Sequence, residues 1–155
     1  MFSGTLLLCD GCDRMSSGKW LIFGLYDRID IQGATGVHDL AFYAKIFTLY
    51  EGKLDLTLAI YNRQEGNANP RPQVQITAPM TLSTNPGVLQ DAIPGYEAGL
   101  TVQQAHFHVT DEQRIKQEDT LIPFDAVLST NGNEIARCRF SVAFHLKPQV
   151  KTSLI

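Results

Sequence analysis

The sequence predicts an all-β fold, a single-domain antiparallel β-sandwich over residues 1–155 that is immunoglobulin-like or jelly-roll-like. Two stretches in which every second side chain is apolar predict it, one over residues 121–146 and one over residues 40–60. A period of two buries one face of a strand and leaves the other accessible. Glycine- and proline-rich turns between short apolar runs are the third observation. Together they indicate about eight strands, with at most one or two short helices.

The N-terminal part of the chain predicts two strands. The first covers Phe2–Cys9 and is followed by a polar turn over Asp10–Gly18. The second covers Lys19–Ile29, where alternate apolar residues are expected on one buried face. These residues are Leu21, Phe23, Leu25 and Ile29.

The central stretch predicts a hairpin of two strands over Leu40–Tyr50 and Leu54–Tyr61, joined by a three-residue loop over Glu51–Lys53. The expected pairs are Tyr50 with Leu54, Ile46 with Leu58 and Ala44 with Ile60. The first strand is also apolar on its second face, at Ala41, Tyr43, Phe47 and Leu49. We therefore expect this strand to be central in its sheet, or covered on its second face by another element or another chain.

The next segments predict shorter elements. A strand is expected over residues 73–78, and Pro79 is expected to end it. The region from Ser83 to Gly99 carries prolines and glycines and is expected to be irregular, apart from one turn around Val88–Ala92.

The strand over Leu100–Val109 changes its apolar parity, which predicts a bulge near Gln103-Gln104. After it, Thr110 and Gln113 match a capping box, so one short surface helix is expected there.

The closing hairpin has a register that the alternation dictates, because opposite residues of an antiparallel pair share a face. A three-residue loop, or a two-residue loop with a bulge, sets apolar residues opposite apolar ones. The pairs are Leu128–Ala136, Ala126–Cys138, Phe124–Phe140 and Ile122–Val142. The loop is Asn131-Gly132-Asn133, and Asn133 is the residue expected to adopt the left-handed conformation.

Composition and charge exclude several classes of partner. The formal net charge is −3 and the basic residues are scattered, so we expect no nucleic-acid partner. The start MFSGTLLLCDGC lacks the positive region of a secretory signal, and no segment approaches the roughly 18 apolar residues of a membrane helix. Three cysteines, an odd number, predict a reducing cytoplasm rather than a disulfide framework.

Both ends of the chain resemble a known family. The N-terminal segments are Leu6-Leu7-Leu8-Cys9-Asp10 and Gly18-Lys19-Trp20-Leu21-Ile22-Phe23-Gly24-Leu25-Tyr26-Asp27-Arg28-Ile29. The C-terminal segments are Asn131-Gly132-Asn133-Glu134-Ile135-Ala136 and Phe140-Ser141-Val142. They resemble a family of small bacterial proteins described only as a domain of unknown function, whereas residues 62–99 depart from it. The resemblance implies a small intracellular bacterial β-sandwich and names no catalytic residues.

Cys9 and Cys12 form a C-x-x-C motif, which in redox proteins supplies an attacking and a resolving thiol. The carboxylates of Asp10 and Asp13 are expected to raise a thiolate's pKa, and no thioredoxin-like pattern surrounds the motif. The alternative is a buried Cys9 beside an incidental Cys12. A structural zinc site would need further ligands, and the alternation places the remaining Cys138 in the core.

His106 and His108 share one face of a strand, so both imidazoles could reach one metal ion. The alternative is two histidines in solvent, opposite the buried Ala105, Phe107 and Val109. If Cys9 and Cys12 lay beside them, a zinc site with two cysteines and two histidines would form. Clustered aspartates could bind calcium, but the spacing of Asp10, Asp13, Asp27, Asp30 and Asp39 matches no EF-hand.

Three functions therefore compete. The first is a non-catalytic sandwich that acts as a protein-interaction or accessory module, with a protein partner or a homo-oligomer and no cofactor. The second is a thiol- or metal-dependent enzyme that uses Cys9, Cys12, His106 and His108. The third is a sandwich that binds a small ligand or a carbohydrate with its loops at 62–72 and 83–99.

Overall fold

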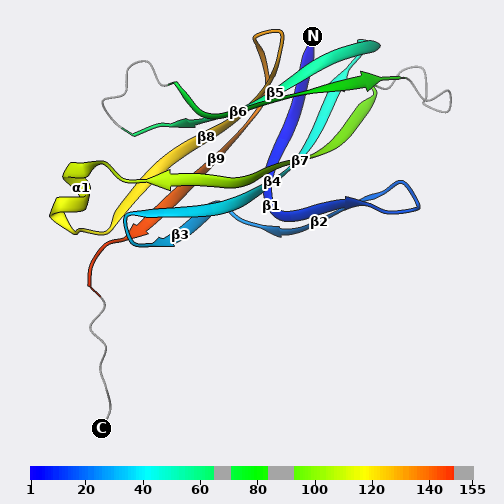
Figure 1. Cartoon of the computed structure of the whole chain (residues 1–155). Helices are drawn as coiled ribbons and strands as arrows, with labels where there is room; N and C mark the ends of the chain where they lie inside the picture. The colour runs from blue at the N-terminus through cyan, green and yellow to red at the C-terminus, as the bar shows by residue number, and fades with distance from the viewer. Residues whose placement is uncertain (65–70, 84–92, 149–155) are drawn as a thin grey trace.

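The computed structural model describes residues 1–64, 71–83 and 93–148, which form two β-sheets packed face to face (Figure 1). One sheet has four strands in the order β2-β1-β4-β7, and the other has five in the order β3-β9-β8-β5-β6. The elements are β1 (Phe2–Arg14), β2 (Trp20–Leu25), β3 (Arg28–Gln32), β4 (Thr35–Thr48), β5 (Gly52–Asn62), β6 (Pro72–Leu82), β7 (Gly95–His108), α1 (Asp111–Lys116), β8 (Thr120–Thr130) and β9 (Asn133–His145). The predicted all-β sandwich is confirmed, with nine strands in the described residues in place of about eight.

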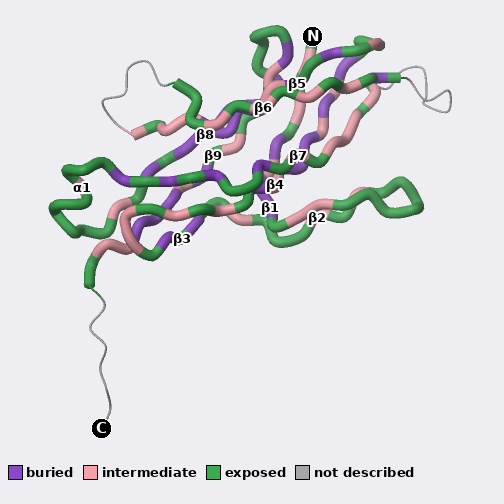
Figure 2. Tube along the Cα trace, viewed as in Figure 1, coloured by how far each residue is buried: buried purple, intermediate pink, exposed green. Residues whose placement is uncertain are grey.

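The core lies between the two sheets, where alternate side chains of the facing strands are buried (Figure 2). β4 contributes Leu40, Phe42, Ala44 and Ile46, and β5 contributes Leu54, Leu56, Leu58 and Ile60. Three aromatic rings meet in this layer. Phe124 stacks on Phe140 with ring centroids 5.5 Å apart, and Phe107 meets Phe124 edge-on at 5.3 Å. Such contacts add to the free energy gained by removing the rings from water.

The predicted hairpin of residues 40–61 is wrong, although its strands exist. β4 pairs with β1 and β7, whereas β5 pairs with β6 and β8, so the chain crosses from one sheet to the other between them. The apolar rows of β4 and β5 face each other across the core instead of lying side by side. The alternation determines which side chains of a strand are buried. Two strands in opposite sheets bury these side chains as well as two neighbouring strands of one sheet do, so the alternation does not identify the pairing partner. The prediction that strand 40–50 is central is confirmed, because β4 lies between β1 and β7.

The N-terminal strands also differ from the prediction. β1 does not end at Cys9 but continues to Arg14, and the turn is confined to the residues between Met15 and Lys19. The expected strand over Lys19–Ile29 is two strands in different sheets, β2 and β3. β3 pairs in parallel with β9, an exception to the antiparallel pattern. Of the predicted buried row, only Ile29 lies in the core.

The closing hairpin of β8 and β9 has the predicted register. Phe124 lies opposite Phe140, and the other three expected pairs are also present. A bulge after Leu128 leaves a two-residue turn at Asn131-Gly132. The left-handed residues are Asn131 (φ 48°) and Gly132 (φ 77°), so the expectation for Asn133 is wrong. A turn with two positive φ angles suits the twist of the flanking strands, and Asn-Gly supplies it at low cost.

The remaining elements agree with the sequence except at Gly95–Gly99 and at Pro79. β7 begins at Gly95, so the expected irregular segment up to Gly99 is wrong for its last five residues. β6 continues through Pro79 to Leu82, because β6 is an edge strand and an edge tolerates a residue that has no N–H group. β7 has the predicted bulge, where Gln104 adopts φ 54° and its N–H donates to Asp39 at 2.7 Å. Helix α1 has the predicted capping box. The turn expected around Val88–Ala92 lies outside the described residues.

No helix among the described residues is both long and apolar enough to cross a membrane.

Candidate functional site

Four strands lie at the edges of the two sheets, and three of them carry features that hinder pairing with another chain. β6 contains Pro72 and Pro79, β7 contains the bulge at Gln104, and β3 exposes Arg28 and Asp30. Charges, prolines and bulges are the usual means by which an edge strand avoids association. β2 has none of the three, because its sequence WLIFGL contains no charged residue and no proline, and its register with β1 has no shift. Among the described strands, β2 pairs with β1 alone.

β2 also exposes an apolar row. Leu21, Phe23 and Leu25 are 52%, 51% and 63% exposed, although the alternation predicted them in the core. They are exposed because β1 stops pairing with β4 at Cys9, and its second half pairs with β2 as a separate hairpin. Figure 2 shows this hairpin extending from the body of the sandwich with little buried surface. Exposed apolar rows of this kind mark interaction surfaces.

The other side of the hairpin covers the second face of β4. Trp20 meets Tyr43 edge-on with ring centroids 5.9 Å apart. Cys12 and Trp20 both lie over Gly99, so closely that a Cβ added there would come within 3.0 Å of the Cys12 sulfur. The Tyr43 hydroxyl donates to Glu97, and burial together with this contact raises the pKa of Tyr43. The hairpin therefore covers the second apolar face of β4 at Tyr43, as expected, whereas Leu49 at the end of this face is 77% exposed.

The two cysteines of the C-x-x-C motif belong to the β1 strand of this hairpin. Cys9 is buried and its thiol lies 3.6 Å from the Ala41 carbonyl oxygen, while the Cys12 thiol lies 3.7 Å from that of Phe42. Burial, and next the neighbouring Cys12, raise the pKa of Cys9 from 9.0 to about 11, and burial also raises the pKa of Cys12. A redox nucleophile needs a lowered thiol pKa. The geometry therefore disfavours thiol chemistry at this motif.

The two histidines lie on the exposed face of β7, away from the cysteines. His106 and His108 are exposed between buried residues, as predicted, and lie opposite Val37 and Thr35 of β4. Cys9 lies opposite Ala41, four to six residues further along β4. At about 3.3 Å per residue this separation is roughly 13–20 Å. Within the described residues, no group of three or more cysteine, histidine or acidic side chains could hold a metal ion.

Cys138 and the aspartates considered for calcium binding lie in separate parts of the fold. Cys138 is half-buried rather than in the innermost core. The Asp39 side chain accepts from the backbone of Gln104, and the Asp30 carboxylate pairs with Arg28 and with His145. These carboxylates already have protein partners in different parts of the fold, so the structure gives the calcium hypothesis no support.

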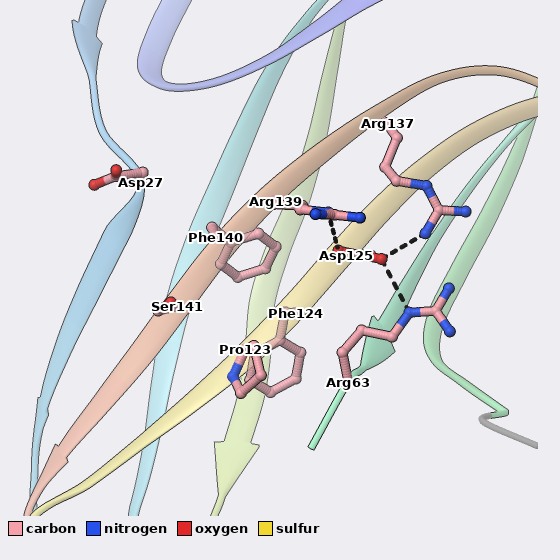
Figure 3. A pocket seen from close by; sticks show the side chains of 9 residues that line it. All are labelled: Asp27, Arg63, Pro123, Phe124, Asp125, Arg137, Arg139, Phe140 and Ser141. Carbon is pink, nitrogen blue, oxygen red and sulfur yellow. Dashed lines mark hydrogen bonds and ion pairs between the residues drawn. The ribbon is translucent and has the colours of Figure 1, made fainter. Parts of the chain in front are cut away.

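A group of arginines that the sequence analysis did not identify surrounds Asp125 on the outer face of the five-stranded sheet (Figure 3). Asp125 is buried and accepts hydrogen bonds from Arg137 and, at 2.9 Å, from Arg63 Nε. Arg139 Nε lies 3.6 Å from the other carboxylate oxygen. Arg137 also pairs with Glu134 at 2.8 Å.

This arginine group lines a hollow of about 740 Å³. Its wall carries three arginines and two aspartates, Asp125 and Asp27, which leaves one net positive charge. Figure 3 places Asp27 apart from the arginines, with its side chain directed away from them. Guanidinium groups bind carboxylates and phosphates through paired hydrogen bonds. The sequence contained a signal for part of this arginine group, because the predicted register of the closing hairpin already sets Asp125 opposite Arg139.

The fold and these surfaces define the class: an all-β sandwich with an exposed, uncharged edge strand. No protein-family model and no curated protein matches the chain, so the resemblance of its two ends to a bacterial family remains a prediction. Among solved structures, the chain is similar to the structure of the N-terminal domain of PorA, with a TM-score of 0.35 and 13% sequence identity. The alignment covers 92% of this chain and 99% of that one.

Proposed function

We propose that this protein is a non-catalytic interaction module that associates with a second copy of itself through β2. The observation that carries the proposal is the combination of an edge strand without charge or proline and an exposed apolar row on the same strand. Among the strands that the structure describes, none pairs with the outer side of β2, and a strand from another chain would satisfy the peptide groups there.

The expected affinity follows from the exposed row. Fully burying a leucine or phenylalanine contributes about 1.5–3 kcal/mol, and Leu21, Phe23 and Leu25 each still expose about half of their surface. Six such side chains in a dimer therefore contribute roughly 6 kcal/mol, and each backbone hydrogen bond adds about 1 kcal/mol. Association costs about 4–15 kcal/mol. We therefore expect a dimer that forms at micromolar concentrations or above.

The surroundings of the cysteines and histidines named in the enzyme hypothesis support a non-catalytic role. The thiols of Cys9 and Cys12 are held in the protonated form by burial. His106 and His108 lie on a separate part of the sheet. The enzyme hypothesis predicts either a thiol of lowered pKa or a metal ion held by these residues, and neither feature is supported by these surroundings.

Sedimentation equilibrium over a range of protein concentrations tests the proposal. The unmodified chain should form dimers, and Phe23→Lys should weaken the association at least tenfold, because it places a charge in the apolar row. Leu121→Lys is the matched control, since Leu121 is also an exposed apolar residue, at 58%, but lies on β8. A chain that stays monomeric up to millimolar concentration overturns the proposal. Equal weakening by Leu121→Lys assigns the contact to another surface.

A second candidate function, the binding of a small acidic ligand, is favoured by the arginine-lined hollow at Asp125. Arg139 is 83% exposed, so much of its guanidinium group is accessible. Calorimetric titration with inorganic phosphate and with citrate tests this candidate, and Arg139→Ala should remove any binding. Equal binding by Arg139→Ala contradicts it.

A further inference from the structure

We infer that β2 pairs with β2 of the second copy as antiparallel strands related by a two-fold axis at Phe23. This inference rests on the self-association proposed above and adds the register of the contact. A two-fold dimer uses the same surface on both copies, so the residues of β2 must be complementary to the same residues in reverse order.

The sequence of β2 and its flanks has this complementarity. With the axis at Phe23, residues whose numbers add to 46 lie opposite each other. Phe23 then meets Phe23 of the second copy, and Leu21 meets Leu25. The exposed row of one copy therefore continues into the exposed row of the other, and opposite pairs of this kind stabilise a sheet.

The charges at the two ends of this segment agree with the same axis. Lys19 precedes β2 and Asp27 follows it, and both are exposed. Their numbers also add to 46. The Asp27 carbonyl accepts from the Ser141 N–H of β9, so the shared ladder ends before Asp27, and the lysine side chain of one copy meets the aspartate side chain of the other beyond the paired strands. The Asp27 side chain is directed away from the arginine group of its own chain, which leaves it accessible for this contact (Figure 3).

Neighbouring registers lack this agreement. Opposite residues of an antiparallel pair share a face. The exposed rows of the two copies therefore lie on the same face only if the two-fold axis passes through a residue and not midway between two residues. An axis at Ile22 sets Lys19 opposite Leu25, and an axis at Gly24 sets Asp27 opposite Leu21. Each of these places a charge against an apolar side chain.

The side chains on the other face of β2, at its even-numbered positions, also fit the axis at Phe23. Gly24 lies opposite Ile22 of the second copy, and the absence of a side chain there leaves room for the isoleucine. Gly24 has φ 66°, and a Cβ at this position would collide with Asp10, so glycine is required on two grounds.

Cysteine cross-linking measures the register directly. Under mild oxidation, Phe23→Cys should cross-link with itself. Leu21→Cys and Leu25→Cys should cross-link only when the two variants are mixed, with one chain carrying a size tag. Opposite Cβ atoms lie about 4.5–5.5 Å apart, whereas positions four residues out of register are separated by about 13 Å, too far for a disulfide. The unmodified chain gives the background from its own three cysteines, and near-ultraviolet circular dichroism verifies that each variant is folded.

The other registers give different patterns. An axis at Ile22 predicts cross-links between Leu21→Cys and Phe23→Cys, and an axis at Gly24 predicts them between Phe23→Cys and Leu25→Cys. Either pattern, or a dimer that cross-links at none of the three positions, overturns the register while self-association stands. A chain that remains monomeric overturns both.

Charge reversal provides a second measurement that needs no cysteine. Lys19→Asp places a new aspartate near Asp27 of the other copy at both ends of the paired strands. The repulsion should weaken association about three- to tenfold. Adding Asp27→Lys restores both opposite-charge pairs and should recover the affinity of the unmodified chain. A double variant as weak as Lys19→Asp overturns the register.

Discussion

Replacing Asp125 by asparagine tests how much the arginine group contributes to stability. The substitution keeps the shape of the side chain and removes its charge. Arg63, Arg137 and Arg139 then surround a neutral amide, and Glu134, which pairs with Arg137, remains as a counter-charge. The new amide N–H groups also face N–H groups of the guanidinium ions, so at least one contact becomes repulsive.

The magnitude follows from the contacts. Asp125 accepts two charged hydrogen bonds, from Arg63 and Arg137, each worth about 1.5–3 kcal/mol when well buried. The carboxylate side chain is only 7% exposed, but those of Arg137 and Arg63 are 29% and 37% exposed, so solvent weakens both pairs. We expect the free energy of unfolding to fall by about 2–3 kcal/mol.

Urea unfolding followed by circular dichroism measures this loss. For a slope of about 2 kcal/mol per molar urea, the midpoint should fall by about 1–1.5 M. Asp55→Asn is the matched control, because Asp55 is an exposed aspartate of β5 in the same sheet and should change the midpoint little. Both variants are compared at one protein concentration, since a dimer links stability to concentration.

A midpoint for Asp125→Asn within about 0.2 M of the unmodified chain would refute this reasoning. It would mean that the cost of removing the carboxylate from water offsets its attraction to the arginines.

Three further predictions concern the core and two titrating groups. Phe124→Ala empties a buried site next to Phe140 and should lower the free energy of unfolding by about 3–5 kcal/mol in the same titration, and a loss under 1 kcal/mol would contradict it. His145, and then Arg28, hold the pKa of Asp30 below 3.8, so its stabilising effect is present above that pH and is lost as the pH falls through the lowered pKa. The difference in midpoint between Asp30→Asn and the unmodified chain should therefore shrink in acid, and a constant difference would rule this out. Burial raises the pKa of Cys9 from 9.0 to about 11, so iodoacetamide should modify Cys9 more slowly in the native than in the unfolded protein, and stability should decline above pH 9 because the unfolded thiol ionises first. Equal rates in the two states would contradict this.

The sequence predicted the closing hairpin well because its register depends on local information. The turn residues Asn131-Gly132 and the alternation on both sides constrain each other, and a shift by one residue would expose a whole row. The error at Asn133 is small in comparison, since the bulge after Leu128 moves the left-handed conformation to Asn131.

The partner of a strand was harder to predict than its buried face. Leu40–Ile46 and Leu54–Ile60 are buried as expected, but they face each other from opposite sheets. The short segment between them permits either a hairpin or a crossing, and the choice depends on β1, β6, β7 and β8, which are distant in the sequence.

The prediction that the apolar row of β2 is buried was wrong for a related reason. Leu21, Phe23 and Leu25 have the alternation of a core strand, and the single sequence does not distinguish a row buried in its own core from one available to another chain. Arg63 could not be assigned to the arginine group either, because its approach to Asp125 depends on the pairing of β5 with β8.

The chain contains one tryptophan, and its position makes it an intrinsic optical probe of the β1–β2 hairpin. Trp20 lies at the start of β2, where its indole ring contacts Tyr43 on one side of the hairpin. Its emission therefore reports whether the hairpin is seated on β4, without a contribution from any other indole. Opening of the hairpin should shift this emission to longer wavelength before the core phenylalanines are exposed, so a single unlabelled sample can separate local detachment from global unfolding.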